Sequence, residues 1–225
     1  MANIMTAADN EAKAGAWKMS FRRNIILNLL NHIKSVIDQV YADMASAVSG
    51  SGTVELSFSI ADTAAASDTA VLAATNLGAE SQTVTEGIIS PDVPRAVVAK
   101  PTLAGGTLTG NVVIAGTDIN DNAITDTLAL NNGATITSLK AFKTVSSVQL
   151  PAYVTDGDTI SIGISAKLGS PVLLSEATIY LALVDGARDS ALPTILTDAA
   201  DISKVLITPA TAPNGSRDFK FFYHI

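Results

Sequence analysis

The stretch NVVIAGTDINDNAITDTLAL, residues 111–130, shows the pattern that decides the fold of this chain. Its two ends, residues 111–115 and 125–130, are rich in β-branched and aliphatic side chains, which favour strands. Its centre, residues 118–122, is dense in Asp and Asn, which tolerate turn geometry and hydrogen-bond to their own backbone. The stretch therefore predicts a β-hairpin.

The centre of this stretch also resembles a calcium-binding loop. Oxygen-bearing side chains alternate at Asp118, Asn120 and Asn122, as they would around a hard cation. An EF-hand loop would place Gly at its sixth position and a bidentate Glu at its twelfth, where this chain has Ala123 and Ala129. We therefore expect a turn here, and no metal ion or cofactor in the protein. A weak surface cation at residues 118–122 is the alternative.

Strand-forming segments separated by turn residues continue through most of the chain. They lie at residues 54–60, 96–99, 111–115, 125–130, 145–150, 159–164, 177–184, 205–208 and 219–223. Hydrophobic residues make up 48% of the chain and charged residues only 16%, a balance typical of proteins with many short strands. The spacing predicts a mainly β fold, with an antiparallel β-sandwich or a barrel-like domain.

The N-terminal part of the chain follows a different periodicity. Before the Gly/Ser-rich joint at residues 49–52, apolar residues recur at alternating steps of four and three, which is a heptad pattern. The residues of this seam are Ile26, Leu30, Ile33, Ile37, Val40 and Met44. We therefore divide the chain into an N-terminal arm with an amphipathic α-helix (1–48), the joint (49–52) and a β domain (53–225).

The seam predicts that the chain associates with itself. Ile33 and Val40 fall on d positions, where β-branched residues disfavour a two-stranded coiled coil. We expect a homotrimer with the six seam residues at the interface. The alternative is that the helix packs on its own β domain, because Leu29, Val36 and Tyr41 widen the apolar stripe beyond a narrow seam.

Charge and composition argue against several classes of function. The formal net charge of -7 and the pI of about 4.7 argue against a nucleic-acid partner, which needs clustered Lys and Arg. The chain has no Cys and only His32 and His224, and no catalytic constellation is complete, so we expect no enzyme. The apolar stretch at residues 25–30 is too short to span a bilayer, so we expect no membrane partner.

One further pattern links distant parts of the chain. Between residues 94 and 171 stand GTDINDNAIT (116–125), KAFKTV (140–145), LPA (150–152), GDTISIG (157–163) and KLG (167–169). Near the end of the sequence, PNGSRDF (213–219) precedes a segment with further aromatic residues. These stretches resemble a β-rich module of structural proteins of tailed bacteriophages. The likeness rests on turn and strand patterns, and the segment before residue 94 does not share it.

The resemblance implies a virion component made in the host cytoplasm. It points first to an auxiliary head protein, a decoration or cement protein that binds the major capsid protein on the outside of an assembled capsid. A tail, neck or head-fibre component is the alternative, because it would use the same module at another location. A carbohydrate- or receptor-binding module is the third class, and the aromatic content of 5% offers little material for the exposed platform that it needs.

The N-terminal arm is the expected contact with the capsid shell. It combines apolar and basic side chains, whereas the rest of the chain is acidic. The residues concerned are Trp17, Lys18, Phe21, Arg22 and Arg23. The alternative is that these residues cap the helix onto its own domain.

Overall fold

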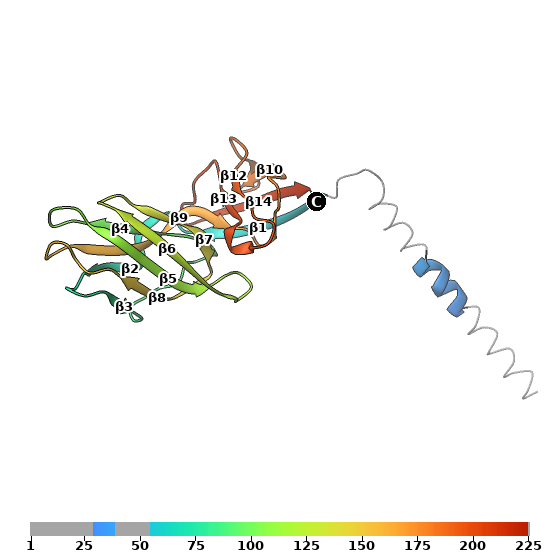
Figure 1. Cartoon of the computed structure of the whole chain (residues 1–225). Coiled ribbons are helices and arrows are strands. Elements are labelled where there is room, and N and C mark those ends of the chain that lie inside the picture. The colour runs from blue at the N-terminus through green and yellow to red at the C-terminus, as the bar shows by residue number, and fades with distance from the viewer. Residues whose placement is uncertain (1–28, 39–54, 225) are drawn as a thin grey trace, which may run out of the picture. The chain divides into compact units, whose positions relative to one another are not determined.

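The computed structural model describes residues 29–38 and 55–224 of the chain. Two compact units are present, Met1–Val54 and Glu55–Ile225. In the first unit, residues 29–38 form an α-helix with apolar and polar side chains on different faces. In the second, almost all regular structure is β (Figure 1). This confirms the prediction of a mainly β domain preceded by an amphipathic helix.

The strands of the second unit form three sheets whose paired strands are all antiparallel. The first sheet contains, in order, β1 (Glu55–Thr63), β14 (Arg217–His224), β10 (Ile179–Val184) and β11 (Ala187–Arg188). The second contains β12 (Thr194–Leu196), β13 (Leu206–Thr208), β9 (Thr159–Gly169), β4 (Arg95–Thr102) and β7 (Ile136–Phe142), with β2 (Ser67–Asn76) also paired to β9. The third contains β3 (Gln82–Val84), β8 (Thr144–Leu150), β5 (Thr109–Thr117) and β6 (Ala123–Asn131).

The hairpin predicted from residues 111–130 is present as β5 and β6. Its register runs without a bulge from the pair Thr109–Asn131 to the pair Thr117–Ala123. More buried and more exposed side chains alternate along both strands, so that Val112, Ile114 and Leu128 are buried on one face. The tight Asp/Asn turn and this alternation together fix the register, because a slip by one residue would turn the apolar side chains outward.

The first core lies between the second and third sheets. Ile160 and Ile162 of β9 and Val97 of β4 meet Ile114 of β5 and Val148 of β8 there. Only Lys143 separates β7 of the second sheet from β8 of the third, so the chain passes directly from one layer to the other. This half of the unit is the β-sandwich or half-barrel that the spacing of strands predicted.

The second core lies under the first sheet and combines aliphatic side chains with several aromatic ones. Phe219 and Phe221 of β14 are fully buried in it, and Phe58 of β1 packs against it. Leu168, near the end of the long strand β9, belongs to this core, whereas Ile160, Ile162 and Ile164 of the same strand belong to the first. Strand β9 therefore connects the two cores.

Candidate functional site

The helix at residues 29–38 carries the described part of the predicted seam. Its apolar side chains Leu29, Leu30, Ile33, Val36 and Ile37 are between 45% and 57% exposed. Along the helix these five residues follow one another at sequence steps of one, three, three and one, which keeps them on one stripe. Three of the predicted interface residues, Leu30, Ile33 and Ile37, therefore lie together.

The remaining predicted contact residues fall outside the described part of the chain. For the seam these are Ile26, Val40 and Met44. For the shell contact they are Trp17, Lys18, Phe21, Arg22 and Arg23. Both sets stay predictions.

The turn at residues 118–122 uses its oxygen atoms to hold its own backbone. Asp118 is only 4% exposed, and its Oδ1 accepts from the N–H groups of Asn120 (2.8 Å) and Asn122 (2.9 Å). Its Oδ2 accepts from Nδ2 of Asn122 at 3.1 Å. Asp121 has a positive φ of 64°, and its carboxylate accepts from Nζ of Lys143 at 2.7 and 2.9 Å. The alternation of oxygen-bearing residues thus serves the turn.

A cleft of about 410 Å³ lies between this turn and the loop at residues 200–202. Asp201 faces it but also caps a short 3-10 helix (Ile202–Lys204), because its Oδ1 accepts from the Ser203 N–H at 3.1 Å. Burial raises the pKa of Asp201, but hydrogen bonds from Ser203 and Lys204 outweigh burial and leave it below its ordinary value. The carboxylates beside this cleft are therefore occupied by structural contacts.

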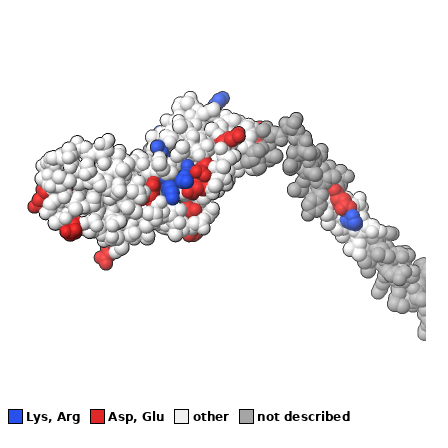
Figure 2. Space-filling view, in the orientation of Figure 1, with Lys and Arg blue, Asp and Glu red and all other residues white. Residues whose placement is uncertain are grey.

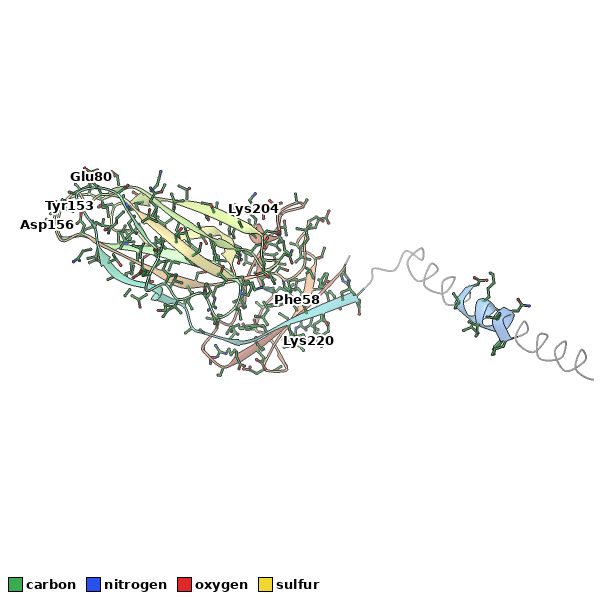
Figure 3. All side chains as sticks on the ribbon, turned by 90° about the horizontal axis from the view of Figure 1, so that it is seen from below. Phe58, Glu80, Tyr153, Asp156, Lys204 and Lys220 are labelled. Atoms are coloured by element: carbon green, nitrogen blue, oxygen red, sulfur yellow. The ribbon has the colours of Figure 1, made fainter. Side chains whose placement is uncertain are left out.

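The loops at the far end of the first core are tied together by Asp158. Its buried carboxylate accepts from the backbone N–H groups of Ala104 (2.9 Å), Val154 (3.2 Å) and Thr155 (2.9 Å). Hydrogen bonds from Thr155 and then Ala104 are the main causes that lower its pKa below the ordinary 3.8. Figure 3 shows the neighbouring Asp156 at this end of the unit, beside Glu80 and Tyr153 and away from Phe58 and Lys220. Asp158 is thus a structural residue.

We expect Asp158→Asn to lower the melting temperature at neutral pH by several degrees, because an amide NH₂ would face N–H donors. The contribution of a carboxylate with a lowered pKa is complete above its unfolded pKa, about 3.8, and is lost as pH falls through the folded value. The stability difference between the two proteins should therefore shrink below that pH in denaturation curves measured across the acid range. Asp156→Asn, in the same turn but exposed, is the control and should change stability little.

Arg95 is the largest fully buried side chain and lies near the junction of the two cores. Its Nη1 donates to Oδ1 of Asp92 at 2.9 Å and to the Ala64 carbonyl at 3.0 Å. Asp92 also accepts from the Ala64 N–H at 2.7 Å, so the pair holds the connection between β1 and β2. Burial lowers the pKa of Arg95 and the Asp92 carboxylate partly offsets this. This ion pair therefore ties the connection between β1 and β2 to the start of β4.

The outer face of the first sheet carries an aromatic cluster that the composition did not suggest. Along β14, Phe219, Phe221 and Tyr223 point to the second core, so Phe222 and His224 point away from it. Tyr180 of β10 stacks on His224 with ring centroids 4.2 Å apart and lies 6.4 Å from Phe222.

Two charged residues border this aromatic cluster. Nζ of Lys220 lies 5.0 Å from the centre of the Phe222 ring, within the range of a cation–π interaction. Partial burial raises the pKa of Tyr180, and the nearby Glu55 carboxylate raises it further. The alternation within the predicted strand 219–223 was the sequence signal for this cluster, because it puts every second residue on the outer face.

Charged side chains are unevenly spread over the second unit. In Figure 2, the end of the second unit that lies farthest from the first sheet shows only isolated acidic side chains on the visible face. Basic and acidic side chains gather instead toward the strands of the first sheet. The visible surface at that end is therefore mostly uncharged.

Within residues 29–38 and 55–224, no helix is long and apolar enough to cross a membrane. The same ranges hold no group of three or more His, Asp or Glu side chains arranged to bind a metal ion.

Comparison with known proteins gives no relative for this chain. No protein-family model matches it. No curated protein and no solved structure matches it either.

Proposed function

We propose that the protein is a non-enzymatic structural component of a phage virion, which binds the major capsid protein on the outside of the capsid and stabilises the shell. In this proposal it acts as a homotrimer, held partly by the N-terminal helix. The arm with Trp17, Lys18, Phe21, Arg22 and Arg23 makes the shell contact.

The observation that carries the proposal is the exposed apolar stripe on the helix. Soluble proteins rarely leave a continuous stripe of Leu, Ile and Val in water unless another surface covers it. The heptad spacing and the β-branched residue at Ile33 favour identical helices as that surface, in a bundle of more than two. A trimer also presents three shell contacts at once, so that a modest contact in each chain becomes effective through multivalency.

The β unit supports the structural part of the proposal. Residues 94–171, where the resemblance to phage proteins lies, span β4 to β9 and supply most of the first core. The carboxylates of Asp118, Asp158 and Asp201 all accept hydrogen bonds from the backbone of the loops around them. These contacts support a role for the β unit as a rigid body that the N-terminal arm anchors to the capsid.

A tail, neck or head-fibre component would use the same body at a different location. The position of the protein in a virion reconstruction separates the two classes. A regular lattice of copies over the head supports decoration, and a single ring or an axial position supports the alternative.

The aromatic cluster on the first sheet favours a receptor- or carbohydrate-binding module as a second candidate function. Tyr180, Phe222 and His224 supply ring surface, and Glu55 and Lys220 supply polar groups beside it. Oligosaccharide binding that Phe222→Ala removes, without change in the circular dichroism of the β unit, would favour this candidate.

We expect deletion of residues 1–24 to abolish binding to undecorated capsids of the same phage while the β unit stays folded. The physical reason is that the arm carries the apolar and basic groups, whereas the rest of the chain is acidic. Co-sedimentation with capsids measures binding, and circular dichroism measures folding. Lys220→Gln, which changes an exposed basic residue outside the arm, is the control and should bind as the full chain does. Unchanged binding of the truncated protein would place the shell contact elsewhere.

A further inference from the structure

The chain contains two Asn-Gly pairs, Asn132-Gly133 and Asn214-Gly215, and both are exposed. An Asn side chain can react with the backbone nitrogen of the next residue, and Gly offers that nitrogen the least steric hindrance because it has no Cβ. Asn is for this reason one of the thermolabile residues of proteins. The two pairs have the same sequence but different surroundings.

Asn132-Gly133 lies in the turn between β6 and β7. Asn132 has a positive φ of 52°, a conformation that Asn tolerates better than most residues. Two hydrogen bonds close the turn. The Asn132 N–H donates to the Leu108 carbonyl (3.2 Å), and the Ala134 N–H donates to the Asn131 carbonyl (3.1 Å). Neither bond involves the Gly133 nitrogen. In the described part of the chain, neither that nitrogen nor the Asn132 carboxamide has a hydrogen-bond partner.

In Asn214-Gly215, both groups that would react, the Gly215 N–H and the Asn214 carboxamide, form hydrogen bonds. The Gly215 N–H donates to the Thr63 carbonyl at 2.7 Å. Oδ1 of Asn214 accepts from the N–H (3.1 Å) and the hydroxyl (3.3 Å) of Ser216. For reaction, the Gly215 nitrogen would have to leave Thr63 and the carboxamide would have to leave Ser216, and each lost hydrogen bond adds to the barrier.

We infer that Asn132 is a site of spontaneous deamidation in the folded protein and that Asn214 is protected. The Gly133 nitrogen loses its proton and attacks Cγ of Asn132, which forms a new C–N bond. The Cγ–Nδ2 bond breaks, and the amide group leaves as ammonia after taking up a proton. Solvent water then opens the resulting succinimide at either carbonyl and leaves an aspartyl or an isoaspartyl residue. No oxidant or reductant is involved.

The modification alters the connection between the third sheet and the second. Each event adds one negative charge to a chain whose net charge is already -7. The isoaspartyl product also adds a methylene group to the backbone of a turn that two hydrogen bonds hold closed. Aged protein should therefore separate into bands of lower isoelectric point.

Incubation of the full-length protein in mildly alkaline buffer, followed by peptide mapping with mass spectrometry, tests the inference. We expect deamidation at Asn132 to be about tenfold faster than at Asn214, the ratio that roughly one to two retained hydrogen bonds imply. In urea sufficient to unfold the protein, the two sites should react at similar rates. Equal rates in the folded protein, or faster reaction at Asn214, would overturn the inference.

A pair of glycine variants tests the role of the Gly133 nitrogen. A Cβ at Gly133 would lie 3.7 Å from Cδ1 of Leu103, an ordinary contact, so Gly133→Ala should fold and should slow the reaction at Asn132 severalfold. Gly105→Ala, whose Cβ would lie 3.8 Å from Cγ2 of Thr155, is the matched control and should leave that rate unchanged. An unchanged rate in Gly133→Ala would also contradict the proposed attack.

Discussion

Gly163→Ala should lower the free energy of unfolding by about 3 kcal/mol or more, the upper range for overpacking a core. Gly163 lies in β9, where β2 crosses so closely that an added Cβ would lie 1.8 Å from the Ser67 carbonyl oxygen. It would also lie 2.5 Å from Cα of Asp68. These are backbone atoms, so no side-chain rotation relieves the clash and β2 as a whole would have to move.

Chemical denaturation with a fluorescence or circular-dichroism signal measures this effect. Gly105→Ala provides the control, because its Cβ would meet only Thr155 at ordinary contact distance. Its free energy of unfolding should stay close to that of the unchanged protein. If Gly163→Ala unfolds at the same denaturant concentration as the control, β2 does not cross β9 as closely as the structure has it.

The same crossing explains why β2 was not predicted from the sequence. Its segment, SDTAVLAATN, is rich in Ala, which has a low preference for strands. The segment is a strand because Val71 and Leu72 pack into the first core and because Ser67 and Leu72 pair with β9. Strand β7, with the sequence ITSLKAF, was missed for a related reason. Its half-polar pattern becomes a strand through antiparallel pairing with β4.

Every strand segment predicted from the sequence overlaps an observed strand, because each combines β-branched residues with flanking turn residues. The segment 159–164 is an instructive case, since the observed β9 continues to Gly169. Its extension, Ser165 to Gly169, contains Ala, Lys and Gly, which are poor strand formers. Pairing with β13 and β4 makes it a strand. Local preference thus predicted where strands lie, and tertiary pairing decided how far they run.

Less of the candidate site was predictable. The turn at residues 118–122 could be assigned because the missing Gly and Glu of a calcium loop are visible in the sequence. The ion pair of Arg95 and Asp92 could not, because nothing in the local sequence shows that Arg95 is buried. The aromatic cluster joins Tyr180 to residues more than forty positions away, and only the pairing of β10 with β14 brings them together.

The helix at residues 29–38 offers the second large effect, this time on assembly. Isolated helices of this length are marginal in water, so most of their stability must come from packing of the apolar stripe. Leu30, Ile33 and Ile37 are about half exposed, and Lys34 pairs with Asp38 at 2.5 Å on the polar side. A bundle of identical helices would bury the stripe and leave this ion pair in solvent.

Ile33→Glu combined with Ile37→Glu should convert the proposed trimer to monomer. In a trimer these substitutions would bring six carboxylates into the seam, where they lose solvation and repel one another. Analytical ultracentrifugation at equal protein concentrations measures the mass, and circular dichroism shows whether the β unit stays folded. His32→Glu combined with Ser35→Glu adds the same charges to the same helix outside the apolar stripe, so this control should remain trimeric. If the unchanged protein is already monomeric, or if the two double variants behave alike, the stripe does not hold copies of this chain together and the helix must serve another contact.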